Sequence, residues 1–304
     1  MPFAEIYRRQ LDLLIRLLPL IAEEKCFALK GGTAINLFIR DMPRLSVDID
    51  LTYLPLQSYD ASLAAIDAAM GRIAIRVKAG IPGATIAEGK KGARTHLLVR
   101  AEGVTTEIEV TPVLRGCVHA SELRSVSEAV EDAFGFAEIQ VLSFADLYAG
   151  KFVAALDRQH PRDFFDTREL LAHEGIDDAL RGAFLVYLVS HSRPVHEVLT
   201  ARRKDMTAEF NRGFDGMTEE PVTLAELVAA REDLIAKIVG AMPDDHRKFL
   251  ISFEKGTPDW SLIGLPAAAN LPAVKWRQIN LDKLTADRRA AQVAALEKVL
   301  SKKP

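Results

Sequence analysis

Asp48 and Asp50 are the first side chains whose type and spacing could do chemistry. They lie in the stretch RLSVDIDL (44–51), which predicts a strand, and residues two apart in a strand project from the same face. At ~5 Å and an effective dielectric constant of ~20, two such carboxylates repel each other by roughly 3 kcal/mol. A hard divalent cation such as Mg2+ would turn that repulsion into a binding site shared with substrate phosphates. An acidic pair on a solvated strand is the simpler alternative.

A diglycine turn precedes this strand. Gly31 and Gly32 follow a predicted strand over 26–30, and Thr33 is placed to cap a short helix over 34–40. Glycines lack a Cβ, so backbone amides in such a turn can approach a phosphate closely. A strand, a Gly-Gly-Thr turn, a helix and then Asp-x-Asp form a more specific order than any one of these pieces.

A third carboxylate lies about sixty residues downstream. The alternation over 105–113 predicts a strand with Glu107 and Glu109 on one face and apolar residues on the other. One reading is a third ligand for metal-assisted phosphoryl chemistry. The other reading is two glutamates that solvate an exposed sheet face, and the spacing weighs equally for both.

A cluster of charged residues follows at 151–166. Lys151 and Arg158 are seven residues apart, so they share one face of a predicted helix. Asp163 and Asp166 share a face of the next helix, which Pro161 can begin. The basic pair could neutralise a triphosphate, or the four residues could form a salt-bridged helix surface.

The elements that must position these side chains divide near residue 140. Before it, the pattern alternates between helices and strands; after it, the pattern is helical. The predicted elements are a helix over 3–24, strands over 26–30 and 45–53, a helix over 58–78, strands over 85–88, 95–100 and 105–113, and helices from 143 onward.

Composition excludes several classes of protein. The 304 residues have 49% hydrophobic content and a net charge of −3, which describes an ordinary globular chain and no polycation. Two cysteines, Cys26 and Cys117, indicate a reducing compartment. With no secretory signal and no run of about 18 apolar residues, we expect a cytoplasmic protein without a membrane span.

Two basic tracts could track a phosphate backbone. One is the predicted hairpin tip at 89–92, and the other is the tract over 275–303, where Trp276 is interleaved with lysines and arginines. A solvated helix face explains the second tract equally well.

Together these residues resemble the nucleotidyltransferase AbiEii/AbiGii toxin family, which includes the MenT toxins. The resemblance covers about residues 3–175 and rests on the order of four motifs: LKGGTAINL, RLSVDIDL, EIEVTPVLRG and LSFADLYAGKFVAALDRQHPRDFFD. It implies an α/β (α+β) polymerase-beta-like nucleotidyltransferase core over 1–140. A mainly helical half over 141–304 would complete the active site and bind the acceptor.

The resemblance also implies roles for individual residues. The residues that would bind the nucleotide are Gly31, Gly32, Thr33, Arg44, Ser46, Lys151, Arg158 and Asp163. The metal ligands would be Asp48, Asp50 and Glu109. Catalysis would involve the same three carboxylates with Lys151 and Asp166. Family members often have Lys-Ile-Glu where this chain has Glu107-Ile108-Glu109, so either glutamate could be the ligand, and Glu109 matches the motif. The family's downstream aspartate falls on Asp163 or Asp166.

The function that the resemblance implies is a Mg2+-dependent toxin of a toxin–antitoxin or phage-defence pair. It would transfer a nucleoside monophosphate from an NTP to an acceptor, expected to be the 3' end of tRNA, and so block translation. Its partners would be the NTP, the RNA and a cognate antitoxin protein. The alternatives are transfer to a protein or a small molecule, a kinase-like phosphotransferase, and a catalytically silent nucleotide-binding module.

Overall fold

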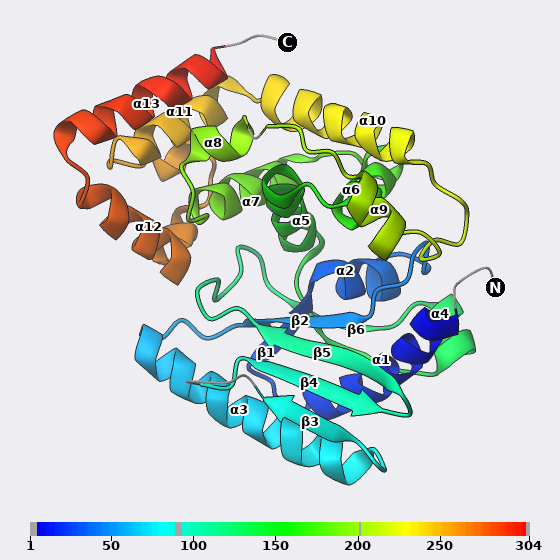
Figure 1. Ribbon diagram of the computed structural model, residues 1–304. Coiled ribbons are helices and arrows are strands. Elements are labelled where there is room, and N and C mark those ends of the chain that lie inside the picture. The colour runs from blue at the N-terminus through cyan, green and yellow to red at the C-terminus, as the bar shows by residue number, and fades with distance from the viewer. Residues whose placement is uncertain (1–4, 89–92, 201, 302–304) are drawn as a thin grey trace. The chain divides into compact units, whose positions relative to one another are not determined.

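The computed structural model describes residues 5–88, 93–200 and 202–301 (Figure 1). It divides into two compact units, residues 1–143 with 213–221, and residues 144–212 with 222–304. The basic tip at 89–92 and the last two lysines of the C-terminal tract lie outside the described residues.

The first unit is built on one mixed sheet, which has seven strands in the described residues, in the order β3-β4-β5-β2-β1-β7-β6. The strands are β1 (Phe27–Lys30), β2 (Asp48–Tyr53), β3 (Thr85–Glu88), β4 (His96–Ala101), β5 (Val104–Val110), β6 (Glu122–Ser125) and β7 (Glu138–Val141). The central strand β2 runs antiparallel to β1 and parallel to β5.

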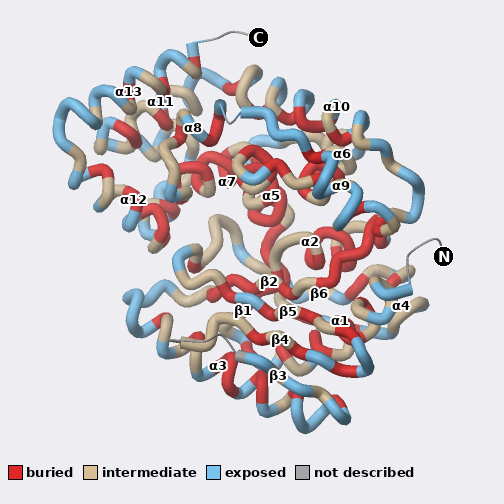
Figure 2. The backbone as a smooth tube through the Cα atoms, in the orientation of Figure 1, coloured by how far each residue is buried: buried red, intermediate tan, exposed pale blue. Residues whose placement is uncertain are grey.

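One face of this sheet is the core of the first unit. Ile49, Leu51 and Ile108 are fully buried, and the alternation expected for β5 is confirmed by its burial pattern (Figure 2). Helices α1 (Glu5–Ala22) and α3 (Tyr59–Gly80) pack on the sheet and on each other. Apolar side chains therefore face these helices, and the polar side chains of the same strands face the opposite side.

The turn after β1 differs from its prediction. The chain becomes helical at Gly31, with α2 (Gly31–Ala34) running into a π-helical turn (Ile35–Ile39). The expected N-cap at Thr33 is therefore wrong, because Gly31 at φ +75° lets the backbone enter the helix directly from the strand.

A later segment completes the first unit. Residues 213–221 belong to it because Leu45 donates its backbone N–H to Met217 O at 2.7 Å, and Arg44 forms an isolated antiparallel bridge with Thr218. The sequence division at residue 140 did not include this segment. Strands β6 and β7 and helix α4 (Glu128–Phe134) were also not foreseen.

The regular secondary structure of the second unit is helical in its described residues. Its α-helices are α5 (Phe144–Arg158), α6 (Pro161–His173), α7 (Asp178–Val189), α8 (Val195–Leu199), α9 (Thr207–Gly213, whose last residue belongs to the first unit), α10 (Leu224–Ile235), α11 (Asp244–Glu254), α12 (Pro272–Asp282) and α13 (Ala286–Leu300). Shorter helical turns lie at Ala236–Gly240, Trp260–Leu262 and Pro266–Asn270.

Helix α5 is central to this unit. It packs against α6, α7 and α8, with the rings of Phe152 and Phe184 centred 6.2 Å apart. Most of α5 is buried, including Lys151, so a charge of this helix is carried into the core. None of the described helices combines the length and apolarity that crossing a membrane requires.

Candidate active-site residues

The strand register brings the acidic residues of the first unit together. Asp50 on β2 is paired with Glu109 on β5, and Asp48 is paired with Glu107. Paired residues on neighbouring strands have Cβ atoms roughly 5 Å apart, so the four carboxylates occupy one patch on the polar face of the sheet. This is the proximity that the Asp-x-Asp spacing alone could not establish.

Two basic side chains extend this row across four strands. Lys30 on β1 is the register partner of Asp50, and His96 on β4 is the register partner of Glu109. His96 Nε2 lies 2.6 Å from Glu107 Oε1, on the diagonal rather than directly across. Neither Lys30 nor His96 was singled out from the sequence, because strand pairing decides which residues share a row.

Gly31 makes room for Asp50. A Cβ added to Gly31 would overlap the Asp50 carboxylate, and the backbone at φ +75° is one that L side chains rarely adopt. Two independent reasons therefore require glycine here. The turn and the carboxylate strand are in direct contact at this point.

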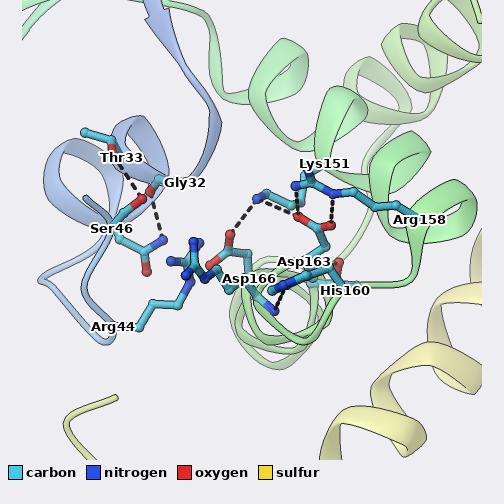
Figure 3. Close-up of polar contacts among 12 residues, drawn as sticks. Gly32, Thr33, Arg44, Ser46, Lys151, Arg158, His160, Asp163 and Asp166 are labelled. Atoms are coloured by element: carbon cyan, nitrogen blue, oxygen red, sulfur yellow. Dashed lines mark hydrogen bonds and ion pairs between the residues drawn. The ribbon is translucent and has the colours of Figure 1, made fainter. Parts of the chain in front are cut away.

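Gly32 makes room for two other side chains. Its added Cβ would lie 2.6 Å from Arg44 Nη2 and 2.9 Å from Ser46 Oγ. Figure 3 shows Gly32, Arg44 and Ser46 as sticks. Arg44 is 1% exposed and donates from Nη1 to its neighbour's carbonyl, Leu45 O, at 2.9 Å. Arg44 and Ser46 therefore lie against the glycine turn, as the family motif suggests, and both are buried.

Thr33 has a structural use for its hydroxyl. The side chain is 1% exposed, and Oγ1 donates to Asp48 O at 2.5 Å and lies 3.0 Å from Ser46 Oγ. A hydroxyl has one proton to donate, so the second contact needs Ser46 as the donor. These bonds tie α2 to the start of β2, and Asn36 adds a bond from Nδ2 to Gly32 O at 2.9 Å.

The second unit holds a buried ion-pair cluster. Lys151 on α5 is 7% exposed, and its Nζ lies 3.1 Å from Asp163 Oδ1 and 2.9 Å from Asp166 Oδ2, both carboxylates on α6 (Figure 3). The i,i+3 spacing places both aspartates on the face of α6 that Lys151 meets. The sequence left open which aspartate is used, and the structure pairs Lys151 with both.

Asp163 also binds Arg158. The guanidinium donates to both carboxylate oxygens, at 2.6 and 2.9 Å, while 62% of the Arg158 side chain stays exposed. Burial alone raises the pKa of Asp163, but the charges and hydrogen bonds of Lys151 and Arg158 outweigh it and hold that pKa far below its ordinary value. Asp163 is thus a fixed anion that orients two cations.

The turn between α5 and α6 is held by polar contacts. Gln159 is buried at φ +52°, donates from Nε2 to Arg202 O at 2.8 Å and accepts from Lys204 N at 3.0 Å. His160 caps α6 by accepting from Arg162 N at 3.2 Å. These contacts fix the turn that follows Arg158, and a positive φ at a glutamine has no clear signal in the sequence.

Among the residues that the structure describes, no three His, Cys, Asp or Glu side chains already converge as a metal-binding group. The strand register gathers the carboxylates, but their side-chain orientations are not those of a preformed ligand cage.

Comparison with known proteins gives the class and then the family. The fold, a mixed sheet followed by many helices, is similar to that of a nucleotidyltransferase toxin with a solved structure. That structure is MenT4 of Mycobacterium tuberculosis H37Rv, which matches with a TM-score of 0.61 and 16% identity over 95% of this chain and 93% of that chain. At this identity the likeness shows the fold.

The family model described as nucleotidyl transferase AbiEii toxin, type IV TA system, matches residues 12–277. The chain belongs to this family of nucleotidyltransferase toxins of type IV toxin–antitoxin systems, so it is a transferase with a nucleotide substrate and an antitoxin partner. The resemblance proposed from the motifs is confirmed. No curated protein matches the chain.

Proposed function

We propose that the first unit is a polymerase-beta-like core that transfers a nucleoside monophosphate from an NTP to a hydroxyl acceptor. The observation that carries the proposal is the register pairing of Asp50 with Glu109, next to the glycine turn in which Gly31 accommodates the Asp50 carboxylate. Family membership supports the reaction class, and the register supports the choice of carboxylates.

Asp48, Asp50 and Glu109 would hold Mg2+. Their donors are all oxygen, which suits a hard cation, and the lack of a Cβ at Gly31 makes room for the Asp50 carboxylate itself. The backbone register already places the strands that carry the three side chains next to one another, which supports the assignment. When bound, Mg2+ would neutralise the triphosphate and polarise its phosphoryl oxygens.

The protein's own groups would do the rest. The backbone amides of Gly31 and Gly32 and the guanidinium of Arg44 would contact the triphosphate. The acceptor oxygen would attack the α-phosphorus, the bond to the β-phosphate bridging oxygen would break, and pyrophosphate would leave. The hydroxyl proton would pass to one of the carboxylates, Asp48, Asp50 or Glu109.

The cluster of the second unit would supply positive charge. Lys151 would neutralise charge as pyrophosphate leaves, with Asp163 and Asp166 orienting its ammonium group. Arg158, oriented by Asp163 and largely exposed, would contact the nucleotide. This assignment gives each aspartate a role: Asp163 orients the cations that would bind the nucleotide, and Asp166 orients the catalytic lysine.

The acceptor that we propose is the 3' end of tRNA, in the cytoplasm, with a block of translation as the consequence. This rests on the toxin family rather than on the C-terminal tract. Arg277 in that tract is buried in an ion pair with Glu254, and Arg289 pairs with Asp282. The tract therefore offers fewer available cations than its composition suggested.

Incubation of the protein with each α-labelled NTP and separate pools of total RNA, protein and small hydroxyl compounds tests the proposal. We expect label in the tRNA band, and prior periodate oxidation of the tRNA 3' terminus should abolish it. Label that appears only in protein or in a small molecule would contradict the tRNA assignment while keeping the transferase. Absence of label from every pool would favour a catalytically silent module.

A further inference from the structure

The polar face of the sheet presents more carboxylates than one metal site needs. Glu107 and Glu109 lie two residues apart on β5, opposite Asp48 and Asp50 on β2. A fourth carboxylate that competes for the cation would change both its charge environment and its position. A metal site that uses three of these carboxylates therefore needs one glutamate to be held apart from the others.

His96 is placed to do this. It lies on β4 as the register partner of Glu109, yet its Nε2 is 2.6 Å from Glu107 Oε1. Cross-strand diagonal neighbours are within reach of long side chains, so the contact follows from the register without distortion. A carboxylate oxygen can only accept, so this contact requires the proton on His96 Nε2, which the imidazolium and one of the two neutral tautomers carry.

The two glutamates consequently have different surroundings. Glu107 has a close partner, whereas within the described part of the chain the Glu109 carboxylate has no hydrogen bond or ion pair. Glu109 is exposed, so it keeps the rotamer freedom that ligation requires.

We infer that His96 is a positioning residue that holds Glu107 aside and leaves Glu109 as the third metal-facing carboxylate. The inference rests on the proposed function, which it deepens.

A set of single and double variants of the full chain tests this, read by Mn2+ titration with electron paramagnetic resonance and by NTP-dependent transfer. Glu109→Gln should weaken Mn2+ binding by at least about tenfold, because it removes a ligand, whereas Glu107→Gln should leave the Mn2+ affinity within about twofold. Glu122→Gln, on the edge strand β6, is the matched surface control.

His96→Ala should release Glu107 toward the cation. We expect Mn2+ to bind about threefold more tightly, because another carboxylate can reach it, and kcat to fall about tenfold because the ion is displaced. Adding Glu107→Gln to His96→Ala should restore both values. His96→Gln, which keeps a donor, should resemble the wild-type protein.

The cycle has outcomes that overturn the inference. Equal losses in His96→Ala and in the double variant would mean that His96 does not act through Glu107. A loss of Mn2+ affinity in Glu107→Gln as large as that in Glu109→Gln would make Glu107 the ligand. Asp50→Asn tests the proposed function separately from the role of His96. If this variant keeps full Mn2+ affinity, the proposed metal site is wrong, irrespective of the results for the His96 variants.

Discussion

At the scale of single residues, the position of the Asp50 carboxylate depends on the absence of a Cβ at Gly31. The glycine carries both a positive φ and a contact that a Cβ would fill. A second glycine, Gly83, has the same φ of +75° with open space around its added Cβ. Comparing substitutions at Gly31 and Gly83 therefore distinguishes the effect of backbone strain from the effect of displacing the Asp50 carboxylate.

We predict that Gly31→Ala abolishes transfer, whereas Gly83→Ala leaves it intact. Each substitution should cost about 1 kcal/mol of unfolding free energy through the left-handed backbone, and the first should cost more because Asp50 must move. Urea unfolding and NTP turnover measure the two effects. Equal turnover in the two variants would show that the space beside Asp50 is not used.

The charge of Asp163 depends on its surroundings. It is fully buried, yet Lys151 and Arg158 keep its pKa below the ordinary value of 3.8. A carboxylate with a lowered folded-state pKa contributes stability that is present above its unfolded pKa. That contribution is lost progressively as the pH falls below 3.8.

We predict that Asp163→Asn lowers the unfolding free energy by about 3 kcal/mol near neutral pH, because two cations lose a buried anion. When the pH is lowered from about 6 to about 3, the unfolding free energy of the variant should fall by about 1 kcal/mol less than that of the wild-type protein. Urea unfolding at both pH values provides the comparison. The exposed Asp245→Asn is the control, and a pH dependence of Asp163→Asn identical to that of wild type would contradict the assignment.

At the scale of elements, strand pairing decides which side chains meet. The alternation of β5 was readable from its sequence, because one face is apolar and the other polar. Its parallel pairing with β2 was not, since register depends on residues sixty positions away. The closeness of Asp50 and Glu109 therefore had to come from the structure.

Other elements were missed for identifiable reasons. The edge strand β6 has four residues, and most of its side chains are exposed, so it lacks the alternation that marks a strand. Thr33 is a residue type that commonly caps helices, but the helix begins two residues earlier, at Gly31. The helices flanking Pro161 were predicted because proline and the apolar spacing act locally.

The hydroxyl of Thr33 gives a prediction at this scale, because it ties α2 to β2. Thr33→Val should lower the unfolding free energy by about 1–2 kcal/mol, since it leaves buried polar groups unpaired, while Thr33→Ser should keep most of it. Chemical unfolding tests whether the hydroxyl ties α2 to β2, and the KM for NTP tests whether it contacts the triphosphate. Unchanged stability with a raised KM in Thr33→Val would instead place the hydroxyl on the triphosphate.

At the scale of the whole molecule, the family sets the reaction class and the two units carry different chemical groups. The first unit holds the carboxylates and the glycine turn, and the second holds the buried lysine with its two aspartates. The motif order in the sequence was sufficient to identify the family. The burial of Lys151 was not readable, because its two partners lie on another helix.

The most direct measurement compares purified tRNA incubated with α-labelled and γ-labelled NTP and Mg2+. For the wild-type protein, we predict label at the tRNA 3' end from the α-labelled NTP alone, with pyrophosphate released. Asp50→Asn and Lys151→Met should each reduce this label by at least about a hundredfold, while the exposed Lys275→Met should not. Label from the γ-labelled NTP, or undiminished α-label with Asp50→Asn, would contradict the account.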